Sequence, residues 1–343
     1  MRDLSRLPKA HLHLHFTGSM DVPLLRTLAE RSGLELPDEL VDARALDLPP
    51  GERGWFRFQR LYEAARRTVT DEWAMRMIVR RAAEHDATEG SVRLEIQVDP
   101  SGYVDAVGSL QAALEIVLDE ARAASADTGV SVGVIVAASR RRHPLDARTL
   151  ARLAIRYAGD GPGEVSGFGL SNDERFGDTD DWAAAFRLAA RHGLASVPHG
   201  GELRGAAHVR EVVRALDPVR LGHGVRAAED PRLLDELASR GIAAELCPTS
   251  NVHMGVFDEV ADVPLRRFVA AGVPVALSAD DPLLFMAGLT DQYEVARRVL
   301  GFTDPELAGL ARASITSSLA PETDKRRWLT EVDAWLAEPD LPP

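Results

Sequence analysis

Three histidines alternate with apolar residues near the start of the chain. They are His11, His13 and His15, in the segment Ala10–Phe16, whose other side chains are all apolar. Because alternate side chains of a β-strand share one face, the three imidazoles can point to the same side. Converging imidazoles are typical of a metal site, although a polar strand face satisfied by hydrogen bonds has the same pattern. The spacing therefore favours a metal centre built on this strand.

Three further polar clusters each follow a short apolar run. The segment His199–Glu202 reads His-Gly-Gly-Glu, Gly222–Gly224 reads Gly-His-Gly, and Ser278–Pro282 reads Ser-Ala-Asp-Asp-Pro. The glycines allow sharp turns that keep the site open around the flanking side chains. Each pattern alone also fits an ordinary turn or a helix start. Their shared position, just after an apolar run, indicates that they belong to one site.

The apolar runs form a set of eight expected strands. They are Ala10–Phe16, Val92–Val98, Val130–Ala138, Val165–Leu170, Leu194–Pro198, Val219–Gly222, Ala243–Cys247 and Val273–Ser278. Segments with helical periodicity lie between them, at Leu110–Ala124, Ala147–Tyr157, Asp180–His192, Ala206–Leu216, Pro231–Ser239 and Pro264–Ala271. Strands that are apolar throughout and alternate with helices predict an α/β fold, a parallel (β/α)8 barrel of the TIM type. In such a barrel the carboxyl ends of the strands meet at one mouth, where the polar clusters would face one another.

The region between the first two expected strands is longer than one crossover helix needs. It spans about 75 residues and has helical patterns at Val22–Arg31, Trp55–Arg67 and Glu72–Asp86. We expect residues 17–90 to form a helical lid over the mouth of the barrel. The end of the chain, Asp304–Leu336, predicts two or three helices outside the barrel. No linker or repeat divides the sequence, so we expect a single domain over residues 1–343.

Composition excludes several classes of partner. The 343 residues carry 40 Lys and Arg against 53 Asp and Glu, a net charge of −13 that would repel nucleic acid and anionic membranes. The longest apolar stretch, Val130–Ala138, is far shorter than the roughly 20 residues that span a bilayer. With one cysteine, Cys247, and no signal-like start, we expect a cytoplasmic protein. No oligomeric state is predicted.

From Pro8 to Pro282 the order of these motifs resembles the adenosine deaminase branch of the amidohydrolase superfamily. In that family the His-x-His of the first strand supplies two zinc ligands, and alignment on Gly18 assigns them to His13 and His15. His11 then stands where the family usually has glutamate, outside the ligand set.

The family's later motifs match as well. Its His-Ala-Gly-Glu resembles His199–Glu202, which makes His199 the third zinc ligand and Glu202 the acid/base. Its Gly-His-Gly and Asp-Asp-Pro resemble the segments around His223 and Asp280. The segment Gly169–Glu174 resembles a loop that contacts the substrate, with Asn172 where the family usually has glycine.

This resemblance implies hydrolytic deamination with one Zn²⁺ per chain. Three imidazoles and one carboxylate, from Asp280, leave a coordination position open, as in catalytic zinc sites. The metal lowers the pKa of water to about 7, and the resulting hydroxide would attack C6 of a small 6-aminopurine. Glu202 would protonate N1, His223 would orient the hydroxide, and Asp281 would bond N7. The products would be a 6-oxopurine and ammonia.

Rival chemistries fit the sequence less well. A cytidine-deaminase zinc site needs Pro-Cys-x-x-Cys, which a chain with only Cys247 cannot provide. A binuclear amidohydrolase would use a carbamylated lysine on a central strand, but the only lysines are Lys9 and Lys325. A catalytically inactive binding protein of the same fold is the non-enzymatic alternative. It would have a broken ligand set, whereas every expected ligand is present.

The choice of substrate depends on Thr17 and Asn172, the two expected substrate contacts that differ from the family pattern. We expect His15, Thr17, Asn172 and Asp281 to contact the substrate, but the family places a carboxylate at Thr17 that reaches the ribose 5′-hydroxyl. Adenosine, with 2′-deoxyadenosine, is the main expectation. Adenine and aminodeoxyfutalosine, a 5′-modified adenosine of menaquinone biosynthesis, are the alternatives.

The segment Trp55–Arg60 of the expected lid suggests a further hypothesis. If Arg57 or Arg60 points into the mouth, either could pair with an anionic 5′ substituent such as the benzoate of aminodeoxyfutalosine. The alternative is that these arginines lie on the solvated face of a lid helix.

Overall fold

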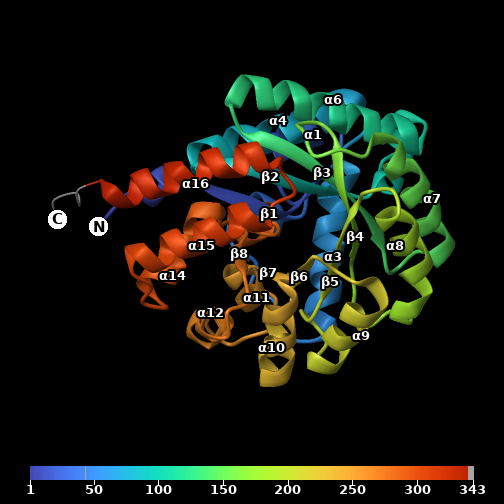
Figure 1. Ribbon diagram of the computed structural model, residues 1–343. Helices are drawn as coiled ribbons and strands as arrows, with labels where there is room; N and C mark the ends of the chain where they lie inside the picture. Colours follow the sequence, from blue (N-terminus) through green and yellow to red (C-terminus); the bar gives the residue numbers. More distant parts are fainter. Residues whose placement is uncertain (43, 339–343) are drawn as a thin grey trace.

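The computed structural model describes residues 1–42 and 44–338 and consists of a parallel barrel surrounded by helices (Figure 1). Eight strands pair in chain order, all parallel. They are β1 (Lys9–His15), β2 (Ser91–Val98), β3 (Ser131–Ser139), β4 (Val165–Ser171), β5 (Ala195–Gly200), β6 (Arg220–His223), β7 (Ala243–Leu246) and β8 (Val275–Leu277). A parallel bridge between Leu14 and Asp280 joins the chain after β8 to β1. The predicted (β/α)8 barrel and its eight strands are confirmed.

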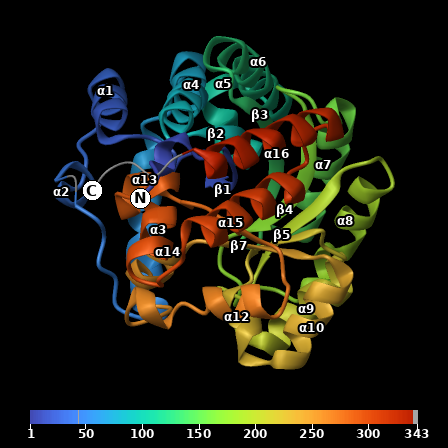
Figure 2. The same cartoon turned by 60° about the vertical axis from the view of Figure 1, so that its left-hand side comes forward.

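Helices pack around the outside of the strands, as Figures 1 and 2 show. Those up to β5 are α1 (Val22–Ser32), α2 (Asp38–Val41), α3 (Glu52–Arg67), α4 (Glu72–Thr88), α5 (Val104–Val107), α6 (Leu110–Thr128), α7 (Pro144–Ala154) and α8 (Ala183–Ala190). After β5 come α9 (Ala206–Leu216), α10 (Pro231–Arg240), α11 (Pro248–His253), α12 (Leu265–Ala270), α13 (Pro282–Phe285), α14 (Leu289–Arg298), α15 (Asp304–Ser317) and α16 (Glu322–Ala337). Short 3-10 helices occur at Leu4–Arg6, Pro100–Gly102, Ile155–Tyr157, Thr179–Trp182, Val225–Glu229 and Val260–Asp262.

Local sequence explains why these elements form where they do. In β3 every residue except the last is buried, because a barrel strand is covered on both faces. Helices begin at residues whose side chains accept backbone N–H groups, such as Asp71 before α4 and Ser109 before α6. The helix after β8 begins at Pro282, whose fixed φ suits the first turn.

A smaller part of residues 17–90 reaches the mouth of the barrel than predicted. Of the helices between β1 and β2, α4 packs against β2 and α6 in the outer layer, as an ordinary crossover helix does. Helix α3 supplies the side chains that reach the mouth. Helices α1 and α2 stand at one edge of the molecule in Figure 2. The four-residue α2 was not predicted.

The end of the chain forms two packed helices, α15 and α16, as predicted, while α14 before them was not. Helix α15 also packs against β1 and β8. Arg2 donates two hydrogen bonds to the carbonyl of Glu338, so the start of the chain lies beside the end of α16. Within the described residues, no helix has both the length and the apolar character that crossing a membrane requires.

Candidate active site

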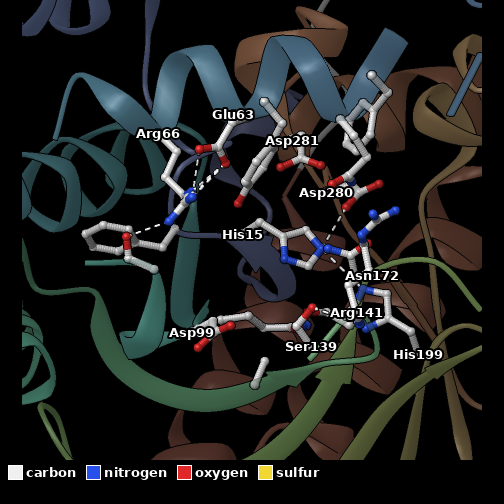
Figure 3. Close-up of a pocket in the computed structure, with 18 of the residues that line it drawn as sticks. His15, Glu63, Arg66, Asp99, Ser139, Arg141, Asn172, His199, Asp280 and Asp281 are labelled. Atoms are coloured by element: carbon white, nitrogen blue, oxygen red, sulfur yellow. Dashed lines mark hydrogen bonds and ion pairs between the residues drawn. The ribbon is translucent and has the colours of Figure 1, made fainter. Parts of the chain in front are cut away.

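A pocket of about 290 Å³ opens at the carboxyl ends of the barrel strands, beneath α3. Most of the predicted site residues line it, namely His15, Asn172, His199, Glu202, His223, Asp280 and Asp281. In Figure 3 His15, Asn172, His199 and Asp280 gather at one end, whereas Glu63, Arg66 and Asp99 lie at the other. Residues up to 266 positions apart in the sequence therefore meet here, because they follow different strands of one barrel.

The four residues predicted as metal ligands meet at the floor of this pocket. His13 Nε2 and His15 Nε2 lie 3.5 and 3.2 Å from Asp280 Oδ1, and His199 Nε2 lies 3.2 Å from His15 Nε2. Two groups of potential ligand atoms overlap at His13. One adds His15 and Asp280, and the other adds His199 and His223.

The donor set fits a zinc ion. His13 Nε2 is buried and lies 3.5 Å from Asp280 Oδ1, at the outer limit of a hydrogen bond, so a metal ion would satisfy this nitrogen better than the contacts among the described residues do. His13 Nδ1 donates to Glu245 Oε2 at 2.8 Å, the usual arrangement behind a metal-binding imidazole. Burial and the charge of His13 lower the pKa of His199 well below its ordinary value, so this ring is neutral and able to ligate.

The two aspartates after β8 have opposite protonation tendencies. Burial raises the pKa of Asp280, but hydrogen bonds from His13 and His15 outweigh it and hold that pKa well below normal. Burial and the charge of Asp280 raise the pKa of Asp281 well above normal. The site thus combines a carboxyl group that favours its ionised form with one that favours its protonated form. Asp280 has φ +65°, a strained conformation for an aspartate, and its Oδ2 accepts from the Ser250 hydroxyl at 2.6 Å.

Glu202 is a buried carboxyl group poised to hold a proton. Burial, followed by the charges of Asp280 and Glu174, raises its pKa well above the ordinary value. Its Oε2 lies 3.6 Å from His223 Nε2. Burial lowers the pKa of His223 to about 3, so this imidazole is neutral. Glu174 accepts backbone N–H groups from residues 202 to 204 and so fixes the loop that carries Glu202.

His11 lies outside the cluster of candidate ligands, as expected. Its Nδ1 is 3.0 Å from Asp86 Oδ1, and its Nε2 accepts the backbone N–H of Ala279 at 3.1 Å. It therefore supports the backbone next to Asp280.

Asn172 and Thr17, the two residues that differ from the family pattern, lie in different places relative to the pocket. Asn172 lines the pocket and has φ +76°, a left-handed conformation that glycine adopts freely and asparagine tolerates better than most residues. Thr17 is fully buried and does not line the pocket; its hydroxyl is 2.6 Å from that of Tyr103, which does. The predicted direct contact between Thr17 and the substrate is therefore corrected: Thr17 lies behind the lining of the pocket, where its hydroxyl contacts Tyr103.

The hypothesis that Arg57 or Arg60 reaches the substrate is wrong. Helix α3 directs other side chains into the pocket, namely Trp55, Phe58, Gln59, Tyr62, Glu63 and Arg66. Because each residue advances the helix by about 100°, Arg57 and Arg60 point away from this face. Both are exposed and lie beside Glu39 instead, at 3.8 and 3.3 Å.

Sequence reasoning missed two residues that hold the candidate ligands. Glu245 bonds His13, and Ser250 bonds Asp280. A glutamate inside the otherwise apolar strand Ala243–Cys247 was a signal, because a buried carboxylate requires a partner. Ser250 gave no comparable signal.

Gly222 leaves the space that the histidine cluster occupies. A Cβ atom there would lie 2.8 Å from His13 Cε1 and 3.1 Å from His199 Nδ1. Gly222→Ala is therefore expected to weaken zinc binding by about tenfold or more, measured by competition with a chelator. Gly309→Ala is the control, because a Cβ atom there would meet no atom of the described residues within 4 Å apart from its own helix backbone and chain neighbours. Equal zinc affinity in both variants would contradict this role.

Comparisons with known proteins agree with the geometry. Residues 8–335 match the family model described as adenosine deaminase. A Streptomyces coelicolor protein with the provisional name adenosine/adenine deaminase is 55% identical, over 98% of both chains. The aminodeoxyfutalosine deaminase of Acidothermus cellulolyticus is 33% identical, over 96% of this chain and 91% of its own.

Among solved structures, the adenine deaminase of Arthrobacter aurescens is similar, with a TM-score of 0.88 and 30% identity. The match covers 96% of this chain and 99% of that one. The chain described here is therefore a member of the adenosine deaminase family, and like the members of that family it is a hydrolase that acts on carbon–nitrogen bonds.

Proposed function

We propose that this protein deaminates the 6-amino group of a purine nucleoside, converting adenosine or 2′-deoxyadenosine to the 6-oxopurine and ammonia with one zinc ion. The observation that carries the proposal is a buried carboxyl group, Glu202, whose raised pKa favours the protonated form, beside a cluster of three histidines and Asp280 at the floor of a pocket. His13, His15, His199 and Asp280 would hold the ion. When bound, Zn²⁺ supplies a hydroxide nucleophile near neutral pH, because the ion lowers the pKa of water to about 7.

The protein's own groups account for the remaining steps. Protonated Glu202 can give its proton to N1 of the purine as C6 is attacked. Neutral Asp281 can donate its carboxyl proton in a hydrogen bond to N7, which only accepts. Neutral His223, beside Glu202, can orient the attacking oxygen and stabilise the charge that develops on it.

The outer half of the pocket supports a nucleoside as substrate. Gln59, Asp99 and Ser139 line the pocket together with the candidate catalytic residues and offer polar groups for ribose hydroxyls. The second candidate is free adenine, because Thr17 replaces the carboxylate that would bind the 5′-hydroxyl and its own hydroxyl is engaged with Tyr103. The name of the Arthrobacter relative agrees with that alternative.

A panel of purines tests this choice. Adenosine, 2′-deoxyadenosine, adenine and aminodeoxyfutalosine are compared by kcat/KM, followed by the ultraviolet change on deamination. We expect adenosine to give the highest value. A preference for adenine or for the carboxylated nucleoside would overturn the choice of substrate but not the reaction.

Arg57→Ala and Arg60→Ala are expected to change kcat/KM by less than about twofold for every substrate in this panel. Both arginines are exposed and lie beside the half-buried Glu39, and ion pairs at the surface contribute little. A selective loss with aminodeoxyfutalosine would contradict the position that the structure gives these arginines.

Zinc affinity should depend on pH through His13. Burial lowers the pKa of His13, but hydrogen bonds to Asp280 and Glu245 outweigh it and raise the pKa to about 10 in the metal-free protein. The proton must leave before Nε2 can bind zinc, so affinity should rise about tenfold per pH unit between pH 7 and 9. Chelator competition at several pH values measures this slope. A flat profile would contradict it.

A further inference from the structure

A continuous chain of buried charged side chains leads from His13 into the interior of the barrel. His13 Nδ1 donates to one oxygen of Glu245 on β7, at 2.8 Å. The other oxygen of Glu245 accepts from Arg220 Nε on β6, at 2.6 Å. All three side chains are buried, with at most 1% of each residue exposed. Both oxygens of Glu245 are thus engaged, and each bond limits where the carboxylate can move.

The chain continues away from the pocket to the C-terminal helices. Arg220 Nη2 donates to Glu95 Oε2 on β2 at 2.6 Å, and Glu95 Oε1 accepts the backbone N–H of Leu319 at 2.6 Å. Arg220 Nη1 donates to the carbonyl of Ser317 at 2.9 Å. The end of this series of charged side chains that lies farthest from His13 is therefore hydrogen-bonded to the connection between α15 and α16.

This interior differs from that of most barrels of the fold, which are filled with branched apolar side chains. Burying charges is costly, and well-packed apolar residues often serve stability equally well or better. Arg93, which donates to Glu95 at 3.1 Å, balances the charges along the chain. The end of this series nearest the pocket is His13, a candidate ligand whose Nε2 lies 3.5 Å from Asp280 Oδ1. A role in orienting His13 explains why charged side chains are buried inside this barrel.

We propose that Glu245, Arg220 and Glu95 are positioning residues that fix the orientation and tautomer of His13, so that its Nε2 faces the metal. The inference rests on the proposed zinc site. Because Nδ1 donates to Glu245, Nε2 is the ring nitrogen left to bind the ion. Arg220 and Glu95 hold Glu245 in place from the opposite side.

The test measures zinc affinity of metal-free protein by competition with a chromophoric chelator, at a fixed pH. Glu245→Gln keeps the size of the side chain but removes its charge, and we expect zinc to bind about 10–100-fold more weakly. Glu95→Gln does not touch His13, and we expect a smaller loss, between about threefold and tenfold. Thermal unfolding of each metal-free variant is recorded in parallel.

Glu120→Gln is the matched control. Glu120 is also a buried carboxylate paired with arginines, Arg76 and Arg80, but it lies on α6 in the outer layer. This variant should lose thermal stability while zinc affinity stays within about twofold of wild type. If Glu245→Gln also loses thermal stability while its zinc affinity stays near that of wild type, the charged side chains are only structural and the inference is overturned. If Glu245→Gln does not fold, Glu95→Gln decides by the same criterion.

The outcome for wild type separates this inference from the proposed function. Wild type that binds one zinc ion, with Glu245→Gln and Glu95→Gln binding equally tightly, contradicts only the positioning role. Wild type that binds no zinc contradicts the proposed zinc site itself.

Discussion

Replacing Glu202 with glutamine is expected to lower kcat by about 10²–10⁴-fold while zinc remains bound. Glutamine keeps the size of the side chain and can still form hydrogen bonds, but it has no carboxyl proton to give to the purine ring. Glu202 is buried, and its pKa is raised by burial and then by the charge of Asp280. Steady-state kinetics and metal analysis of the same preparation measure the two properties together.

The pH profile gives this prediction a second readout. Because the pKa of Glu202 is raised, the protonated form is present below that pKa and is lost as pH rises through it. Activity of wild type should therefore fall on the alkaline side, and the residual activity of Glu202→Gln should not show this fall. Activity near that of wild type would refute the acid/base role. Loss of zinc would mean that Glu202 is a ligand instead.

Removal of the metal is expected to lower activity by about 10³-fold or more and to leave the protein folded. An ion that activates water contributes several kcal/mol to lowering the barrier, and each 1.36 kcal/mol is a factor of ten. Without zinc, a protonated His13 can pair with Asp280 and Glu245, so that the buried carboxylates keep a positive partner. Circular dichroism and activity are measured after chelation and after one equivalent of Zn²⁺ is returned.

The variant His199→Ala is the companion to that experiment, because it removes one candidate ligand from β5. Its activity should stay low when zinc is returned at one equivalent. Full activity of the chelated protein, or full recovery by Mg²⁺ alone, would contradict a zinc-dependent reaction.

The features that the sequence predicted are those that local patterns determine. The alternation of His11, His13 and His15 determines which face of a strand they share, and glycine and proline mark where strands end. Because the strands alternate with helices as in a barrel, the position of each cluster at the end of a strand predicts that Glu202 and Asp280 share one mouth, and both line the pocket.

Features that depend on packing between distant elements were not predictable in this way. The apolar spacing of Trp55, Phe58 and Leu61 indicates the buried face of α3, but the position of this helix over the pocket, with Arg57 and Arg60 beside Glu39, depends on how distant segments pack. The burial of Thr17 behind Tyr103 depends on a loop that follows β2. The bond between His13 and Glu245 joins residues 232 positions apart.

The most direct test of the account measures zinc content and ammonia release from adenosine in one preparation of the purified protein. We expect about one zinc ion per chain, and ammonia and the 6-oxopurine formed in equal amounts at a rate that follows the fraction of chains holding zinc. Zinc-loaded protein that releases no ammonia from adenosine, 2′-deoxyadenosine, adenine or aminodeoxyfutalosine would contradict the proposed function.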